Sequence, residues 1–203
     1  MRKYLVSLLI LTTFLSSCAT TPHSEIFEGR ITPANNRDYQ HLILPLLKSA
    51  KKSVHIVMFQ ASYYTDPRYI KTSPTNLFIR ELIEVKKRGV KVEVILNQSN
   101  SDYESYSAGE NLKTGAYLAN NGIMVYLDTP EKNTHAKFLV IDERFVVIGS
   151  ANWTYSAMAT NNEASVIIDS PKLAQFYINY FEDIKKECRP FLTPLPSPPL
   201  EKK

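Results

Sequence analysis

Two short stretches decide how this sequence folds: residues 134–142 read THAKFLVID, and residues 149–153 read GSANW. Between them, residues 143–148 supply a polar turn followed by a second apolar run. Two apolar runs of β-forming residues joined by a short polar turn indicate a β-hairpin. The hairpin returns GSANW to the start of the first strand, so the polar side chains of both stretches are expected to lie together.

These polar side chains predict a site for a tetrahedral oxyanion. His135 and Lys137 are two residues apart, and alternate residues of a strand lie on the same face. Ser150 and Asn152 add a hydroxyl and an amide, and Gly149 permits a close approach of the backbone. The set therefore contains a cation, two neutral hydrogen-bonding groups, and a nucleophile or base.

The spacing of these residues resembles that of the phospholipase D superfamily. His135, Lys137, Asp142 and the segment 149–152 follow the pattern His-x-Lys, four residues, Asp, six residues, Gly-Ser-x-Asn. The resemblance covers roughly residues 33–186 and includes the acidic Asn-Asn-Glu element that follows the motif in small bacterial members. It implies that family's fold, an α/β/α sandwich with a mixed β-sheet.

The resemblance also implies a phosphodiesterase with defined residue roles. His135 would attack phosphorus and form a covalent phosphohistidine. Lys137 and Asn152 would bind the non-bridging oxygens, and Ser150 would position the phosphate. Glu163 would accept a hydrogen bond from the far nitrogen of His135, as the carboxylate of a catalytic triad does.

Two further expectations concern what the site contains and what it lacks. Asp142 and Gly149 are expected to be structural members of the motif, and no metal or other cofactor is expected because Lys137 supplies the positive charge.

The reaction needs a second histidine as general acid. The chain carries one motif, and His55 lies in an apolar run where it is expected to be packed. We therefore expect a homodimer with one composite site.

The rest of the sequence predicts an α/β domain. Strand and helix patterns alternate first and strands then cluster, which favours a mixed sheet covered by helices on both faces. Helices are expected over residues 38–50, 73–89, 111–120 and 171–187, and strands over 54–59, 90–96, 123–127, 136–141, 145–148 and 164–168.

The N-terminus has the layout of a secretory signal peptide over residues 1–17. Arg2 and Lys3 precede an apolar run that is shorter than the about 20 residues needed to span a bilayer. The tetrapeptide LSSC, which ends at Cys18, resembles a bacterial lipobox and implies a lipid-modified Cys18. An ordinary signal peptide with an incidental cysteine is the alternative. We expect an exported, membrane-anchored lipoprotein, at the outer membrane or periplasm of a cell with two membranes and otherwise at the cell surface.

Domain organisation follows from length and proline content. The 203 residues fit one domain, expected over residues 33–189, with a tether over 18–32 and a proline-rich extended tail over 190–203. If Cys18 carries lipid, Cys188 has no partner in its own chain. It is then expected to be part-buried near a helix end, with an intermolecular disulfide as the alternative.

Composition leaves the substrate open between phospholipid and nucleic acid. The net charge of +4 includes Arg2 and Lys3 of the signal peptide, so a nucleic-acid footprint is not evident. The segment 99–110 holds three acidic and no basic residues, which would repel a polyanion. A non-catalytic phosphate-binding lipoprotein is the competing hypothesis. Loop aromatics are compatible with base stacking, a lipid interface or ordinary half-burial: Tyr63, Tyr64, Tyr69, Tyr103, Tyr106, Trp153 and Tyr155.

Overall fold

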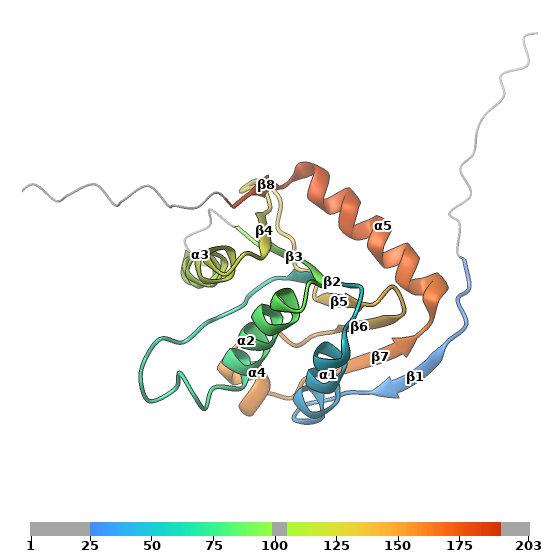
Figure 1. The fold of residues 1–203 in the computed structure, drawn as a ribbon, viewed down its shortest axis with the longest axis horizontal. Coiled ribbons are helices and arrows are strands. Elements are labelled where there is room, and N and C mark those ends of the chain that lie inside the picture. The colour runs from blue at the N-terminus through green and yellow to red at the C-terminus, as the bar shows by residue number, and fades with distance from the viewer. Residues whose placement is uncertain (1–24, 99–104, 192–203) are drawn as a thin grey trace, which may run out of the picture.

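The computed structural model describes residues 25–98 and 105–191, which form one sheet with helices on both faces (Figure 1). The predicted α/β class with a mixed sheet is confirmed. The strands are β1 (Arg30–Pro33), β2 (Ser53–Met58), β3 (Lys91–Leu96), β4 (Met124–Leu127), β5 (Phe138–Ile141), β6 (Phe145–Gly149), β7 (Ser165–Asp169) and β8 (Arg189–Pro190). The helices are α1 (Asp38–Ser49), α2 (Pro74–Lys87), α3 (Ser105–Asn120), α4 (Tyr155–Ala159) and α5 (Pro171–Glu187).

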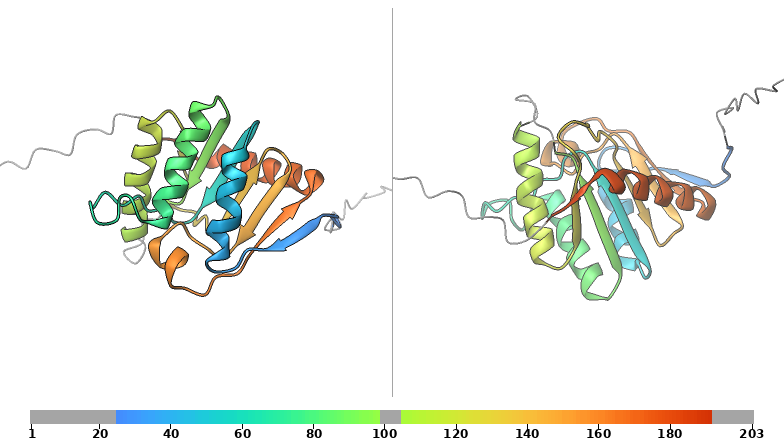
Figure 2. Two further views of the ribbon diagram at one scale, coloured as in Figure 1. Left: turned by 60° about the horizontal axis from the view of Figure 1, so that its bottom comes forward. Right: turned by 90° about the horizontal axis from the view of Figure 1, so that it is seen from above.

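The strands run in the order β1-β7-β6-β5-β2-β3-β4-β8 across the sheet. Neighbours β2, β3 and β4 are parallel and the other pairs are antiparallel. Parallel pairing needs crossover connections, which α2 and α3 provide. Figure 2 shows α1, α2 and α3 on one face and α5 on the other.

Alternation along β2 explains how one strand serves both layers. Ile56 and Met58 belong to the larger core cluster, which includes residues of α1, α2, α3 and α4. Val57 points to the opposite face and packs in the smaller cluster with Phe181 of α5. Every residue of this strand is buried, so it reads in sequence as a continuous apolar run with one polar interruption, His55.

The sheet extends beyond the predicted domain bounds of 33–189 at both ends. β1 begins at Arg30 and pairs with β7, so the end of the expected tether is an edge strand. β8 pairs with β4, and Phe191 N donates to Val125 O at 2.8 Å, so the start of the expected tail also belongs to the sheet. Such short edge strands carry no apolar pattern that would reveal them.

Some expectations for the termini fall outside the described residues. These are the signal peptide over 1–17, Cys18, the tether before residue 25, and the tail from residue 192. Within 25–98 and 105–191, no helix combines the length and the hydropathy that crossing a bilayer requires. Cys188 is half-buried at the C-terminus of α5, as predicted, and its thiol donates to Ile184 O.

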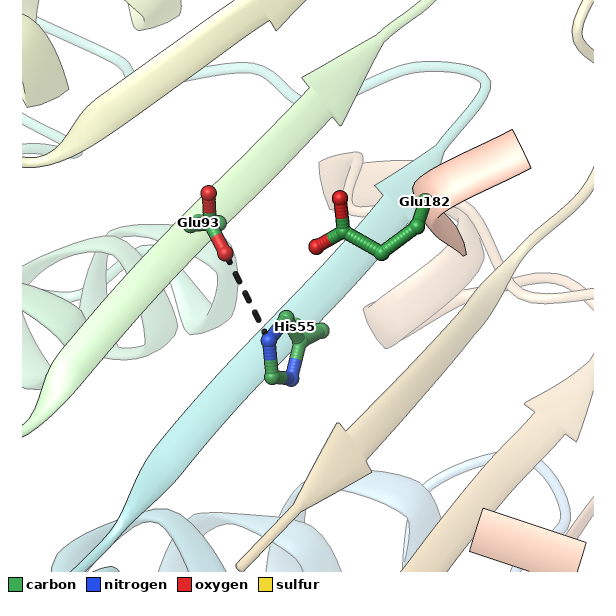
Figure 3. Close-up of side chains that lie close together, drawn as sticks. All are labelled: His55, Glu93 and Glu182. Carbon is green, nitrogen blue, oxygen red and sulfur yellow. Dashed lines mark ion pairs between the residues drawn. The ribbon is translucent and has the colours of Figure 1, made fainter. Parts of the chain in front are cut away.

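A cluster of charges lies buried between the sheet and α5 (Figure 3). Glu93 of β3 is 2% exposed and pairs with Lys91 at 2.6 Å and Lys185 at 3.1 Å. His55, buried as predicted, places Nε2 at 3.5 Å from the same carboxylate and packs edge-on against Phe181. Burial acts to raise the pKa of Glu93, but its partners His55, Lys91 and Lys185 hold that pKa well below its ordinary value.

Replacing the central carboxylate should therefore destabilise the fold in a pH-dependent way. Glu93→Gln should lower the free energy of unfolding at neutral pH by about 2 kcal/mol, because it removes the buried charge with which Lys91 and Lys185 pair. The folded pKa lies below the unfolded one, so this contribution is complete above the unfolded pKa of roughly 4.3 and is lost as pH falls towards the folded value. Urea unfolding of both chains should show the difference shrinking towards roughly pH 3.

The matched control for this experiment is Glu84→Gln. Glu84 pairs with Lys87 on the exposed side of α2, where an ion pair contributes little. A Glu93→Gln difference that stays constant across the acidic range would contradict the assignment of Glu93 as the charged centre of the cluster.

Candidate active site

The polar residues of the hairpin surround a cavity of about 530 Å³ between β5, β6 and α5. The structure thus brings together four of the predicted site residues, and two tyrosines of α5 complete the wall. The lining includes His135, Lys137, Ser150, Asn152, Tyr177 and Tyr180.

The segment that carries His135 is fixed by the ends of two parallel strands. Thr134 is buried, and its backbone N–H donates to Asn97 Oδ1 at 2.8 Å and to Asp128 Oδ2 at 3.0 Å. Asn97 follows β3 and Asp128 follows β4, and the carboxyl ends of parallel strands are where such sheets bind ligands. His135 and Lys137 lie just before β5, which begins at Phe138. The predicted strand over residues 136–141 included Lys137 and is corrected in this respect.

Phe59 orients the histidine and the lysine together. Its ring centroid lies 4.6 Å from that of His135, and Lys137 Nζ lies 5.0 Å above the same ring. Lys137 Nζ also donates to His135 O at 2.8 Å. The buried Asn111 of α3 holds the chain here, donating to Phe59 O and accepting from Ala61 N, both at 2.8 Å. No sequence signal distinguished Phe59 from other core aromatics.

Lys137 is a desolvated cation at the wall of an open cavity. It is 8% exposed, and burial lowers the pKa of its ammonium, an effect that the charge of Glu163 opposes. Within the described residues Lys137 forms no ion pair, in contrast to Lys185 in the buried cluster. A desolvated, unpaired ammonium attracts an anion more strongly than one in water does.

Glu163 lies beside Ser150 and not beside His135. Ser150 Oγ donates to Glu163 Oε2 at 2.5 Å, and Asn161 Nδ2 donates to Glu163 Oε1 at 3.2 Å. Asn36 holds the backbone of Glu163, accepting from its N–H at 2.7 Å and donating to its carbonyl at 3.0 Å. Among the described residues no hydrogen bond joins Glu163 to His135, so the expected contact is absent within one protomer.

Gly149 and Asp142 shape the hairpin. A Cβ atom on Gly149 would lie 2.1 Å from Ser165 Oγ and 2.4 Å from Ala164 O, so only glycine permits this approach of β6 to β7. Asp142 lies in the hairpin turn with φ of 55°. Its carboxylate accepts hydrogen bonds from the backbone N–H groups of residues 51–53 and thereby ties the turn to the start of β2.

Two of the loop aromatics considered for substrate stacking have structural roles. Trp153 is 1% exposed and stacks on Phe78, and Tyr63 stacks on Tyr117. The two tyrosines that line the cavity, Tyr177 and Tyr180, lie instead on α5, where the helical pattern did not single them out. Tyr64, Tyr69 and Tyr155 lie in the described part of the chain, and the side chains of Tyr103 and Tyr106 lie outside it.

One group among the described residues has ligand atoms close enough for a metal ion: His55, Glu93 and Glu182, within 4.8 Å of one another (Figure 3). Lys91 and Lys185 already pair with Glu93 and compensate its charge. A metal would have to displace them, and the group does not line the cavity of His135. These residues therefore fit a structural charge cluster better than a metal centre.

Comparison with known proteins identifies the family. Residues 43–185 match the family described as cardiolipin synthase, PLD-like domain. The chain belongs to the phospholipase D superfamily. The sandwich around the hairpin of His135 and Lys137 is the phospholipase D fold.

Individual relatives agree with this assignment. The chain is 35% identical over 107 residues to a phospholipase D of Rickettsia prowazekii, covering 52% of this chain and 49% of that protein. It is 30% identical over 158 residues to a mitochondrial cardiolipin hydrolase of Xenopus tropicalis, covering 78% and 66%. The chain thus spans between about half and two thirds of the length of these relatives.

Two solved structures show the same fold. The phospholipase D family member Nuc of Salmonella typhimurium aligns with a TM-score of 0.66 and 24% identity, over 82% of this chain and 100% of that chain. NucT of Helicobacter pylori aligns with a TM-score of 0.60 and 21% identity, over 81% and 100%. At these identities the likeness concerns the fold alone.

Removing the Phe59 ring should weaken anion binding through Lys137. Phe59→Leu should reduce the affinity for inorganic phosphate about twofold to fivefold, because a cation–π contact contributes about 0.5–1 kcal/mol. The alkaline limit of phosphate binding should also move to lower pH, since the ring favours the charged ammonium. Titration calorimetry across pH measures both effects. The control is Tyr69→Leu, which removes an exposed aromatic ring outside the cavity. An unchanged alkaline limit of phosphate binding in Phe59→Leu would contradict the role of Phe59 in stabilising the charged Lys137.

Proposed function

We propose that this protein is a phosphodiesterase that cleaves phosphodiester bonds through a covalent phosphohistidine on His135. The observation that carries the proposal is the gathering of His135, Lys137, Ser150 and Asn152 around one cavity in the order and spacing of the phospholipase D motif. The names of the relatives, a phospholipase D and a cardiolipin hydrolase, support the same reaction class.

The arrangement accounts for both steps of the reaction. The exposed ring of His135 attacks phosphorus, a P–N bond forms, and the P–O bond to the leaving alcohol breaks. Lys137 compensates the charge on the non-bridging oxygens, with the amide of Asn152 beside it. A general acid gives its proton to the leaving alcohol. Water then attacks the phosphohistidine, the P–N bond breaks, and the phosphomonoester is released.

Ser150 and Glu163 act as a positioning pair in this scheme. A serine hydroxyl has one proton, and Ser150 donates it to Glu163 while its oxygen accepts from Ala164 N at 3.1 Å. Phosphate binding therefore falls mainly to Lys137 and Asn152. Glu163 then orders the turn that carries these groups, in place of the hydrogen bond to His135 that the family resemblance implied.

The general acid is proposed to come from a second copy of the chain. The cavity contains His135 as its one histidine, His55 is buried beneath α5, and His41 lies on α1. A homodimer with two-fold symmetry would place a second His135 opposite the first. We also propose export and membrane anchoring through a lipid on Cys18, on the basis of the sequence pattern alone.

Loss of the nucleophile tests the reaction class. His135→Ala should lower the hydrolysis of bis(p-nitrophenyl) phosphate at least about 1,000-fold, because no covalent intermediate forms. Mass spectrometry of acid-protected wild-type protein should find a phosphoryl adduct on the peptide that contains His135. His41→Ala is the matched control and should retain activity. Phosphate binding by a wild-type protein that turns over no phosphodiester would instead support the non-catalytic phosphate-binding lipoprotein.

Mixing protomers tests the composite site. Equal amounts of wild type and His135→Ala, allowed to exchange subunits, should retain roughly a quarter of the activity of the same total amount of wild-type protein, because only wild-type pairs hold two histidines. Independent sites would retain about half. Subunit exchange is verified with differently tagged chains, and retention near half after complete exchange would rule out the shared site.

A further inference from the structure

We infer that an aromatic ridge along α5 docks on the surface of a lipid bilayer and brings phospholipid to the cavity of His135. The aromatic ridge consists of Phe27, Phe176, Tyr177 and Tyr180. The inference rests on the proposed phosphodiesterase function and deepens it, because it selects phospholipid over nucleic acid as the substrate class.

The aromatic ridge is continuous from the N-terminal end of the described chain to the cavity. The ring centroids of Phe27 and Phe176 are 5.4 Å apart, those of Phe176 and Tyr177 5.7 Å, and those of Tyr177 and Tyr180 6.4 Å. Tyr177 and Tyr180 then line the cavity beside His135. A surface that holds Phe27 and Phe176 therefore lies directly next to the reacting groups.

Large apolar side chains are exposed along and beside this ridge. Phe176 is 50% exposed, Ile26 89% and Ile31 66%. Ile31 pairs directly with Ile168, which packs against the α5 side of the sheet, so Ile31 lies on the same face as the ridge. Contiguous exposed apolar surface of this kind marks an interaction site.

Charge favours a lipid surface over a nucleic acid as the occupant. The cations beside the ridge are already paired, Lys172 with Glu25 at 2.5 Å and Arg30 with Asp169 at 2.6 Å. Nucleic acid is held chiefly by cations free to contact phosphates. A neutral surface of aliphatic and aromatic side chains instead suits the interfacial zone of a bilayer, where amphipathic aromatic rings are enriched.

A smaller cavity on the other side of His135 points in the same direction. This cavity, of about 270 Å³, shares Tyr180 with the first and is lined by Asp183 and Glu187. Both carboxylates are paired, Glu187 with Lys132 at 2.5 Å and Asp183 with Lys186 at 2.7 Å. These lysines are therefore engaged within the chain, as the cations beside the ridge are, and are not free to contact the phosphates of a nucleic acid.

The expected anchor places the ridge within reach of a membrane. Cys18 is the predicted lipid attachment site, and Glu25 is the first residue that the structure describes. Seven residues of fully extended chain span at most about 25 Å. Ile26 and Phe27 follow at once, and the described chain enters the fold beside the N-terminal end of α5 (Figure 1). A lipid on Cys18 would therefore hold this face close to the bilayer.

Fluorescence of a single new tryptophan tests the docking directly. The sequence contains one tryptophan, Trp153, which is fully buried. The full-length lipidated protein carrying Phe176→Trp is reconstituted in phosphatidylcholine vesicles with brominated acyl chains. The new emission should be quenched at least twofold relative to unbrominated vesicles, and equally at low and high salt. Lys87→Trp, at the end of α2 on the opposite layer, is the control and should not be quenched.

Two fluorescence results would overturn the inference. One is an unquenched Trp at position 176. The other is emission of the Phe176→Trp protein that is already blue-shifted in detergent without phospholipid, combined with dissociation of the dimer in Phe176→Ser. That combination would mean that a second copy of the chain covers the ridge.

Kinetics separate this inference from the proposed function. Phe176→Ser should hydrolyse bis(p-nitrophenyl) phosphate at the wild-type rate and phosphatidylcholine vesicles about tenfold more slowly, since about 1.5 kcal/mol of apolar burial is lost at the bilayer. Equal rates of vesicle hydrolysis, or cleavage of DNA but not of lipid by the wild type, would overturn the inference alone. Failure of the wild type on all three substrates would overturn the proposed function.

Discussion

At Gly149 the backbones of β6 and β7 approach so closely that a methyl group would overlap Ser165 Oγ and Ala164 O. This contact sets the geometry of the site. It allows Ser150 N to donate to Ala164 O at 2.9 Å, so the segment after β6 and the segment before β7 continue side by side beyond the strands. Ser150 thereby meets Glu163, and Asn152 comes to the wall of the cavity that Lys137 also lines. A larger residue at position 149 would separate the two segments and with them the anion-binding groups.

Two buried lysines show how the protein separates structural charge from functional charge. Lys185 is paired with Glu93 and Glu182, so its charge is used within the fold. Lys137 is more deeply buried but pairs with no carboxylate among the described residues, and it contacts a carbonyl and an aromatic ring instead. Burial lowers the pKa of its ammonium, and the charge of Glu163 opposes this effect only in part. In the proposed reaction an incoming phosphate would be the anionic partner of Lys137, so that binding of the anion would also stabilise the charged lysine.

The sequence predicted those parts of the fold whose causes are local. Ser170-Pro171 marks the start of α5 because the serine caps the helix and proline tolerates its first turn. The hairpin was predictable because Asp142 accepts the positive φ of its turn. The edge strands β1 and β8 were not predictable, because they carry no apolar pattern. The hydrogen bond between Asn36 and the backbone of Glu163 was not predictable, because it joins residues more than a hundred positions apart. The role of Phe59 was not predictable either, because its contact with His135 forms only when β2 and β5 lie side by side.

The composite site and the aromatic ridge together constrain the proposed dimer. A two-fold axis relates the two copies, and both copies are expected to carry an anchor. If the axis lay in the plane of the membrane, the two ridges would face opposite sides, and only one could reach the lipid. With the axis perpendicular to the membrane, both ridges face the same bilayer, and the cavity between them opens towards the substrate. The subunit contact must then leave Phe176 and Ile31 uncovered, which places it on the far side of His135 from the N-terminal end of α5. A dimer built in any other way would satisfy the chemistry of two histidines but not the delivery of a lipid phosphodiester to them.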